Sequence, residues 1–592
     1  MANRQEYPRP QFYRESWISL NGTWDFSYDD ENKGVQEQWF HSTGTLDRKI
    51  EVPFTYQTKK SGIEETDFHD VVWYQREFEI PSGWDNKQKL LHFGAVDYRA
   101  WVWVNGHYAG FHEGGHVPFH FDITNYLQPE NNYITVRAED PTHDLTQPRG
   151  KQYWKEKSEG IFYTRTTGIW QTVWLEAVAE TYLKKIRFTP DIDQDEVAVD
   201  IHAAHAQPGD EVQVCIQFAG ETVADDIIRI SGSEVHRKIK LGDFNVHNAG
   251  RLWSPESPNL YDAVIKLQRS GQEIDRITSY FGMRKVSVEN GVVMLNNKPY
   301  YMKLVLDQGY FPESLLTPPS EEAILKDIEL TKEMGFNGVR KHQKVEDPRY
   351  LYWADKKGLL VWGEMANAYM YSENAVRRMT AEWQEVIERD YSHPSIVAWM
   401  PINESWGVPN LLSEEKQRQH TLAMYHLTKS LDDTRLAFSN DGWEHTISDM
   451  LTIHDYEASK DVLLNRYSRL ENILQSLPGH KQLYAPGYTY RKEPIQVTEF
   501  GGIAYQKSSW EGWGYSGATT DEEFADRYEA VISAMLESPL VQGFCYTQLT
   551  DVEQEINGLL TYDRKPKIPL ETIRAINEGG KQTRFETEEE KV

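Results

Sequence analysis

The chain has little cysteine, no long apolar run and no excess of basic residues, and each shortage excludes a class of protein. Its only cysteines, Cys215 and Cys545, lie far apart in apolar segments, so we expect neither a disulfide framework nor a cysteine-based metal site. No stretch approaches the ~20 apolar residues that span a bilayer. The first residues, MANRQEYPRPQ, lack the basic start and apolar run of a signal peptide, which predicts a soluble, cytoplasmic protein.

The balance of charge is strongly acidic, with 63 Lys and Arg against 91 Asp and Glu and a net charge of -28. Nucleic acids and anionic membrane surfaces are bound through basic patches, so we expect neither as a partner. A neutral or weakly charged substrate is favoured instead. The 19 Trp and 33 Tyr fit a sugar-binding cleft, although packing in the core alone accounts for most of them.

The 592 residues exceed the ~250 to 300 at which a single hydrophobic core stops growing, so about three domains are expected. Up to about residue 176, short alternating segments are separated by turn signals, and Asn105-Gly106 is typical of a hairpin. The pattern predicts an antiparallel jelly-roll sandwich over residues 1–180. Its expected strands include residues 20–24, 73–80, 101–110 and 133–140.

A second β-rich segment covers residues 181–285. Its alternating runs at 197–204, 211–219 and 259–268 have the spacing of an immunoglobulin-like sandwich. The segment lacks the Cys…Trp…Cys core of antibody domains, so this prediction depends on strand rhythm alone.

From residue 286 to 592, short apolar runs alternate with charged helical stretches, which is typical of βα units around a parallel sheet. Eight such runs predict a TIM barrel. A doubly wound sheet is the alternative, but no glycine-rich phosphate turn follows any of the runs. The expected strands are residues 301–306, 336–340, 359–364, 396–401, 436–439, 450–454, 495–499 and 541–548.

Two glutamates end apolar runs where a TIM barrel places its chemistry, at the C-terminal ends of strands. Glu404 follows IVAWMPIN and Glu499 ends IQVTE. A lone glutamate at such a position is more often a cap or an ion-pair partner. Two that converge from the fourth and seventh strands favour glycosidic cleavage, in which one carboxyl group protonates the leaving oxygen and the other attacks the anomeric carbon.

The roles of such a pair can be separated by electrostatics. Two carboxylates ~5 Å apart, as retaining enzymes require, repel by roughly 3 kcal/mol at an effective dielectric of ~20, or about two pKa units. One carboxyl group is therefore expected to keep its proton near neutral pH. Once the other has become a neutral ester, this repulsion disappears and the first group can serve as the base for water.

Several longer motifs occur in a fixed order along nearly the whole chain. They are NGTWDF, WVWVNG, RTTGIWQTVWLE, FGMRK followed by LNNKPYY, FNGVRKH, HPSIVAWMPINESWG, VTEFGG and TYDRKPK. Together they resemble glycoside hydrolase family 2, the β-galactosidase and β-glucuronidase family. The resemblance implies a sugar-binding-like sandwich, an immunoglobulin-like sandwich and a catalytic barrel.

The resemblance also implies roles for individual residues. Glu404, in the family's Asn-Glu pair, would be the general acid/base, and Glu499 the nucleophile. Asn403 would hydrogen-bond the sugar 2-hydroxyl, with an Asx turn as the alternative. Tyr456 would donate to the nucleophile and hold it ionised.

Other substrate contacts are expected around these residues. His342, in the family's Arg-x-His segment, resembles a substrate-binding histidine, although a lone histidine is commonly structural. His454 and Asp455 precede Tyr456 and are candidates to line the site. Trp406 and Trp443 lie in loops of the catalytic face, where they would stack on sugar or pack as a lid; Trp510 and Trp513 share this position.

Two departures from the family pattern bear on specificity. After the first barrel strand, Asp307 and Gln308 replace the usual Asn-x-His-Glu type segment; they are polar and are expected to bind sugar. The Asn-x-Lys pair with which the family's glucuronidases hold a substrate carboxylate is replaced by Glu555 and Asn557. A buried carboxylate without a cationic partner is costly, so we expect a neutral sugar.

Three charged residues near the second and third barrel strands are expected to play supporting parts. Arg340 would brace the catalytic carboxylates, whereas Lys341 would point away from them because side chains alternate along a strand. Glu364, which ends LLVWGE, would support the site or contact a cation.

The sequence thus predicts a retaining exo-β-glycosidase that hydrolyses terminal, non-reducing β-linked sugars of an oligosaccharide or glycoside, with β-galactoside as the first choice. No cofactor and no metal are expected. Alternatives are a β-glucuronidase, β-galactofuranosidase or arabinosidase of the same family, or a catalytically silent carbohydrate-binding protein on the same scaffold. Members of the family are often oligomers, so a homo-oligomer is left open, without a defined symmetry.

Overall fold

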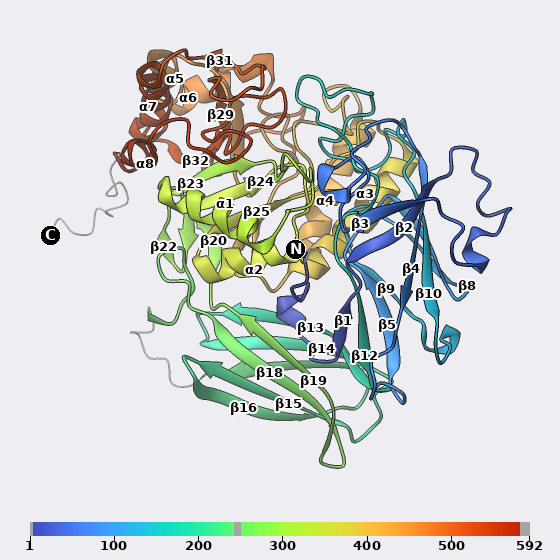
Figure 1. Ribbon diagram of the computed structural model, residues 1–592. Coiled ribbons are helices and arrows are strands. Elements are labelled where there is room, and N and C mark those ends of the chain that lie inside the picture. Colours follow the sequence, from blue (N-terminus) through green and yellow to red (C-terminus); the bar gives the residue numbers. More distant parts are fainter. Residues whose placement is uncertain (1–3, 242–249, 580–592) are drawn as a thin grey trace.

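The computed structural model describes residues 4–241 and 250–579, which form two β-sandwiches and a barrel of eight parallel strands (Figure 1). The fold class expected from the sequence is confirmed. In the figure, the first sandwich is blue, the second is green, and both lie against the barrel.

The first sandwich contains a six-stranded and a four-stranded antiparallel sheet around one apolar core. The expected hairpin is present, and Asn105 (φ 51°) and Gly106 (φ 78°) form its turn in the left-handed region that these residue types tolerate. The larger sheet contains, in spatial order, β3 (Arg48–Val52), β2 (Gly22–Tyr28), β4 (Val71–Phe78), β10 (Asn132–Glu139), β7 (Arg99–Val104) and β8 (His107–Glu113). The smaller sheet contains β1 (Trp17–Ser19), β12 (Val173–Val178), β5 (Gln88–Phe93) and β9 (Phe119–Asp122), and β6 (Val96–Asp97) pairs separately with β11 (Gly168–Ile169).

The second sandwich shows the alternation from which it was predicted. Along β15 (Glu211–Phe218), Val212, Val214 and Ile216 are fully buried, and the residues between them reach the opposite, partly exposed face. One sheet contains β13 (Tyr182–Asp191), β14 (Glu196–Ala204) and β17 (Glu234–Lys240); the other contains β16 (Glu221–Arg229), β15 (Glu211–Phe218), β18 (Tyr261–Arg269) and β19 (Gln272–Phe281). A small sheet of β20 (Val286–Glu289), β21 (Val292–Leu295) and β22 (Lys298–Pro299) leads into the barrel.

The barrel contains all eight expected strands, with small differences in their bounds. In spatial order they are β27 (Leu436–Ala437), β26 (Ile396–Met400), β25 (Leu360–Glu364), β24 (Gly338–Lys341), β23 (Met302–Asp307), β32 (Val541–Thr547), β29 (Ile495–Gly501) and β28 (Leu451–Asp455). The strands read as continuous apolar runs because both of their faces are buried. Leu304 and Leu306 pack inside the barrel with Trp362, whereas Val305 and Val339 pack against the helices.

Most of the helices that surround the barrel begin at a capping side chain. Ser320, Ser372 and Thr520 each accept a hydrogen bond from a backbone N–H in the first turn of the helix that follows. The helices are α1 (Glu321–Glu333), α2 (Pro348–Lys357), α3 (Glu373–Asp390), α4 (Glu415–Leu431), α5 (Lys460–Arg466), α6 (Leu470–Gln475), α7 (Asp521–Glu537) and α8 (Leu570–Glu578). Among the residues that the structure describes, no helix is long and apolar enough to cross a membrane.

The connection between β27 and β28 contains no helix: residues 438–450, all of them described, form an irregular segment. It bridges the one seam of the barrel ladder, where the His454 N–H donates to the Gly442 carbonyl at 3.3 Å. The segment therefore brings its polar residues, including Asp441, to the C-terminal mouth of the barrel.

Candidate active site

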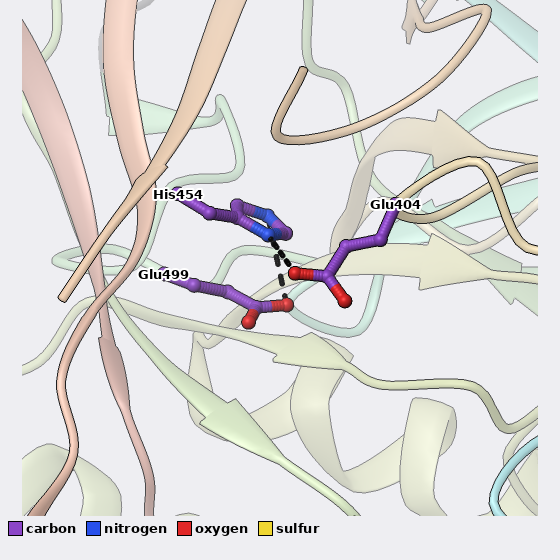
Figure 2. Close-up of side chains that lie close together, drawn as sticks. All are labelled: Glu404, His454 and Glu499. Carbon is purple, nitrogen blue, oxygen red and sulfur yellow. Dashed lines mark hydrogen bonds and ion pairs between the residues drawn. The ribbon is translucent and has the colours of Figure 1, made fainter. Parts of the chain in front are cut away.

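The structure brings Glu404 and Glu499 together at the C-terminal mouth of the barrel. Glu404 lies in the loop after β26 and Glu499 on β29. One carboxyl oxygen of each and one ring nitrogen of His454 lie within 4.8 Å of one another. Figure 2 shows the imidazole of His454 reaching both carboxyl groups.

The loop after β26 holds Glu404 in an uncommon backbone conformation. Glu404 (φ 51°) and Ser405 (φ 59°) are both in the left-handed region, which costs about 1–3 kcal/mol for each residue other than glycine. The turn is held from the segment after β27, where the Asp441 carbonyl accepts from the Glu404 N–H at 3.1 Å and the Asn440 Oδ1 accepts from the Ser405 N–H at 3.0 Å. This turn directs the Glu404 side chain towards β28 and β29.

His454 connects the two glutamates to a third acid. Its Nδ1 lies 2.7 Å from Glu404 Oε1, and its Nε2 lies 2.6 Å from Asp441 Oδ2 and 3.5 Å from Glu499 Oε1. Burial opposes a charge on the ring, but Glu499 and Asp441 outweigh it and raise the pKa of His454 to about 10. The ring is therefore protonated at neutral pH and donates from both nitrogens.

The cation on His454 overturns the expected titration of the pair. Burial favours the protonated acid, but the hydrogen bond and charge of His454 prevail and lower the pKa of Glu404. The expectation that repulsion keeps a proton on one carboxyl group considered only the two acids. In the structure the cation beside Glu404 offsets that repulsion, so the proton resides on the imidazole.

Arg340 contacts several carboxyl groups of the site, including Glu499, as expected. It is fully buried at the end of β24, and burial opposes its charge, yet Asp441 and Glu364 raise the pKa of its guanidinium well above the usual value. Its nitrogens contact Glu364 (2.7 Å), Asp441 (2.8 Å), Asn403 (2.7 Å) and Glu499 (3.1 Å). Lys341 points to the other face, where it pairs with Asp307 at 2.6 Å and Glu346 at 2.7 Å.

Glu499 is fixed from both of its carboxyl oxygens. Arg340 Nη1 donates to Oε1 at 3.1 Å, and the Tyr456 hydroxyl donates to Oε2 at 2.6 Å. The Tyr456 ring is itself stacked on Tyr515, with ring centroids 3.4 Å apart. These two donors hold one orientation of the carboxyl group.

Asn403 and His342 lie beside the two glutamates, and each has a polar atom that makes no hydrogen bond with another described residue. Arg340 donates to Asn403 Oδ1, which fixes the amide, and the Asn403 Nδ2 makes no hydrogen bond with another described residue. Burial lowers the pKa of His342 well below its usual value, so this ring is neutral. Its Nδ1 lies 3.1 Å from Glu364 Oε1, and within the described chain its Nε2 has no hydrogen-bond partner.

Two of the expected tryptophans lie around the carboxyl groups. The Trp443 ring packs against His454 with centroids 5.4 Å apart, and its buried Nε1 has no hydrogen-bond partner among the described residues. Trp406 packs against Tyr369 at 5.0 Å and against Phe162 of the first sandwich at 6.1 Å. Trp510 is 45% exposed and lies near Tyr562.

Asp307 and Asp455 were expected to bind substrate, but the structure does not bring them to the carboxyl pair. Asp307 ends β23 on the side of Val305, facing the helices, where it accepts from Lys341 and from the Gly309 N–H. Asp455 accepts from Tyr467 at 2.9 Å and from Arg466, again on the helical side. Side chains alternate along a strand, so a residue next to an inward-facing one points away from the site. Gln308, on the inner side, donates to Gln548 Oε1 at 3.0 Å.

Sequence reasoning missed Asp441, which contacts both His454 and Arg340. Opposing its burial, the Arg340 and His454 charges strongly lower the pKa of Asp441, so it is a permanent anion. A signal was present, since Asp441 closely follows an expected strand as Glu404 does. Sequence reasoning also missed Lys151 of the first sandwich, whose charge acts on Glu404 and His342, because no local pattern of residues marks it.

A large cavity elsewhere in the molecule does not coincide with this site. It has a volume of about 740 Å³ and lies where the three domains meet, lined by residues such as Phe119, Trp174, His202 and Arg389. None of the site residues expected from the sequence lines it. The chemistry of the barrel mouth, and not cavity size, therefore identifies the candidate site.

Comparison with known proteins gives three family models that match consecutive parts of the chain. The sugar binding domain of glycosyl hydrolases family 2 matches residues 17–173, a second model of that family matches 181–284, and its TIM barrel domain matches 286–579. The chain belongs to glycosyl hydrolase family 2. Its position in that family rests on nearly its whole length.

Curated relatives of this family 2 protein include a β-galactosidase of Thermoanaerobacter pseudethanolicus, 27% identical over 72% of this chain and 53% of the relative. A β-glucuronidase of Paenibacillus borealis is 27% identical over 67% of this chain and 69% of the relative. The chain spans about half the length of several curated relatives, such as 44% of an Oenococcus oeni β-galactosidase. Among solved structures, a Ruminococcus gnavus β-glucuronidase in complex with D-glucuronic acid shares the fold, with a TM-score of 0.78 at 20% identity over 98% of this chain and 100% of that chain.

Proposed function

We propose that this family 2 protein is a retaining exo-β-glycosidase that releases a neutral, terminal, non-reducing β-linked sugar, with β-galactoside as the first choice. One observation carries the proposal: carboxyl oxygens of Glu404 and Glu499 lie within 4.8 Å of each other. Retaining glycosidases hold their two carboxyl groups about 5–5.5 Å apart, whereas inverting ones leave room for a water molecule at about 6.5–9.5 Å. The spacing supports attack by one group and proton transfer by the other.

Glu499 is the nucleophile in this proposal. Arg340 and Tyr456 hold its carboxyl group in one orientation, so that a lone pair can attack the anomeric carbon. The glycosyl ester that forms is neutral. Loss of the Glu499 charge also removes one of the groups that hold a proton on His454.

Glu404 is the acid/base, and His454 supplies its proton. In the free protein the proton lies on His454 Nδ1, 2.7 Å from Glu404 Oε1. A bound substrate excludes water from this pair, and without water the neutral forms of His454 and Glu404 are favoured over the charged forms. The proton therefore moves from His454 to Glu404, which passes it to the leaving oxygen. In the second step the Glu404 carboxylate takes a proton from the water that opens the ester.

Asn403 is suited to bind the sugar 2-hydroxyl. Because Arg340 occupies its Oδ1, the amide presents its N–H groups, and a donor at the 2-hydroxyl stabilises an oxocarbenium-like transition state. The neutral Nε2 of His342 is a further contact, and Trp443 and Trp406 offer apolar surfaces for the sugar ring.

The choice of sugar rests on charge. The family's uronate-binding lysine is replaced by Asn557, and Glu404 and Glu499 already place two carboxylates at the site. A β-glucuronidase is the second candidate, since the solved structures with a similar fold carry that name. At 20% sequence identity, however, this likeness shows the fold alone. β-Galactofuranosides and arabinosides are alternative substrates, because the same double displacement would cleave them.

The test is a panel of aryl β-galactoside, glucoside, glucuronide, arabinoside, galactofuranoside and mannoside, assayed with the wild type and with E499Q. We expect kcat/KM to be highest for a neutral sugar and turnover to be abolished in E499Q. Release of the β-anomer, followed by proton NMR, identifies retention. Turnover of no member of the panel would leave a carbohydrate-binding protein, and release of the α-anomer would contradict the double displacement.

A further inference from the structure

Lys151 is a buried cation that the first sandwich contributes to the barrel mouth. It is 7% exposed, yet within the described ranges it forms no ion pair. Its charge lowers the pKa of His342 together with burial, and it also acts on Glu404. No described residue accepts a hydrogen bond from the Lys151 ammonium, so the group is free to donate to a ligand.

The backbone around Lys151 is docked firmly on the barrel. The N–H groups of Arg149 and Gly150 both donate to the Asn367 carbonyl, at 3.2 and 3.1 Å, and the Tyr369 hydroxyl donates to the Gly150 carbonyl at 2.6 Å. Asn367 in turn accepts from the Asn403 N–H through its Oδ1 at 2.8 Å. The segment that positions Lys151 is thus tied directly to the residue before Glu404.

Glu555 stands at the same edge of the site. The Tyr163 N–H donates to the Lys151 carbonyl at 2.8 Å, and the Tyr163 hydroxyl donates to Glu555 Oε2 at 2.5 Å. Burial raises the pKa of Glu555, and Lys151 is the first of the groups that oppose this effect. The two opposite charges therefore interact across the site without forming an ion pair.

A chain of amides leads to Glu555 from the inner side of the barrel. Gln308 donates to Gln548, Gln548 donates to Asn557 at 2.7 Å, and Asn557 donates to Glu555 Oε1 at 3.1 Å. Gln308 is 3% exposed and its Oε1 has no hydrogen-bond partner among the described residues. A buried amide oxygen left open at the start of this chain is a second group that needs a donor from a ligand.

We propose that Lys151 and Glu555 bind two neighbouring hydroxyl groups of a neutral sugar, with the ammonium donating to one and the carboxylate accepting from the other. This inference rests on the proposed function and narrows its substrate. A hydroxyl group both donates and accepts, so a vicinal diol satisfies both charges. The carboxylate of a uronic acid can only accept: it suits Lys151 but meets the negative charges of Glu404, Glu499 and Glu555.

The test compares wild type, K151M and E555Q on an aryl β-galactoside and its 3-deoxy, 4-deoxy and 6-deoxy analogues. In the wild type, removal of the hydroxyl that Lys151 contacts should lower kcat/KM by on the order of 10–100-fold, the usual effect of losing a hydrogen bond to a charged group. In K151M the same removal should matter less than about threefold, because the partner is already gone. E555Q should show a smaller penalty than the wild type for loss of the adjacent hydroxyl, because its amide oxygen still accepts but carries no charge.

K155M is the matched control, since Lys155 lies in the same loop but is exposed and pairs with Glu159 at the surface. It should keep every deoxy penalty of the wild type. K151M should melt close to the wild type, because the Lys151 side chain makes no hydrogen bond or ion pair with another described residue.

Several results would overturn the proposal. Equal deoxy penalties in wild type and K151M would show that Lys151 contacts no sugar hydroxyl. A loss in K151M confined to the aryl glucuronide would make Lys151 the partner of a uronate. If the wild type hydrolyses no aryl glycoside, the proposed function fails, and calorimetric titration with free galactose still decides the inference: it requires binding that K151M loses, and absence of binding rejects it.

Discussion

The Nδ1 of His454 lies 2.7 Å from Glu404 Oε1, so the candidate acid is hydrogen-bonded to a cation and not merely opposed by a second carboxylate. Glu499 and Asp441 maintain this charge from the other side of the ring. In the proposed mechanism, the acid/base function therefore belongs to the pair of Glu404 and His454. This relationship makes the pH dependence of the enzyme a test of the mechanism.

H454Q should lower kcat/KM for glycosides with poor leaving groups by on the order of 10²-fold, because the proton source of Glu404 is removed. The alkaline limb of the pH profile should also move to lower pH. In the wild type that limb reports the imidazolium, whose pKa is raised to about 10; in H454Q it reports Glu404 alone. An unshifted alkaline limb would exclude His454 as the proton donor to Glu404.

The same substitution should change stability in a pH-dependent way. The folded pKa of His454 lies above its unfolded value of about 6.5, so its contribution is fully present below that pH and is lost as the pH rises through about 10. The difference in unfolding free energy between wild type and H454Q should therefore shrink from pH 6 to pH 10. Urea denaturation across this range measures it, and a constant difference would contradict a protonated ring.

E404A and E499A should fail in different ways. E404A should still form the glycosyl ester from substrates with activated aryl leaving groups, and azide should restore its turnover, since the acid matters most for poor leaving groups. E499A should be inactive on all of them. Equal losses on good and poor leaving groups in E404A, without rescue by azide, would remove the acid/base assignment.

The sequence was sufficient to place the barrel strands and the two glutamates. Strands buried on both faces read as apolar runs, and a polar residue that ends such a run marks the mouth, as with Glu499 at the end of IQVTE. The same rule could not separate Asp307 from Gln308. A shift of one residue along a strand reverses the side to which a side chain points, and the sequence alone does not fix that register.

The remainder of the site depends on contacts between distant segments. Asp441 reaches His454 only because the segment after β27 crosses the barrel seam, and the raised pKa of His454 follows from that contact. Lys151 and Tyr163 come from a different domain. No local pattern of residues predicts a contact between domains, so the sequence did not indicate that Lys151 lies at the candidate active site.

Y456F should slow catalysis while the fold remains intact. The Tyr456 hydroxyl donates to Glu499 Oε2 at 2.6 Å, and loss of a hydrogen bond that orients a charged group should lower kcat by roughly 10–100-fold. The stacked ring on Tyr515 is kept, so KM should change little. Steady-state kinetics on one aryl glycoside gives the answer; an increase in KM at constant kcat would assign Tyr456 to ground-state binding.

R340M should unfold far more readily than the wild type. Arg340 is fully buried and is the shared partner of Glu364, Asp441 and Glu499, and removal of one member of a buried ion pair costs about 3–5 kcal/mol. Urea denaturation at neutral pH measures the loss. R377M is the control, because Arg377 is exposed and pairs with Glu113 at the surface; its effect should be within about 1 kcal/mol.

G150A should disrupt the docking of the first sandwich on the barrel mouth. A Cβ at Gly150 would lie 2.2 Å from the Gln343 carbonyl oxygen, a backbone atom next to His342 that cannot move aside. Gly160 offers a matched control: its φ of 60° equals that of Gly150, 59°, to within a degree, but a Cβ there meets nothing within 4 Å. Both variants should therefore carry the same cost of about 1–2 kcal/mol for a left-handed alanine, and only G150A should also displace Lys151.

We expect kcat/KM of G150A to fall at least tenfold below that of G160A, mainly through KM, while their melting temperatures establish that both are folded. Equal kinetics in the two variants would mean that the loop of the first sandwich takes no part in substrate binding.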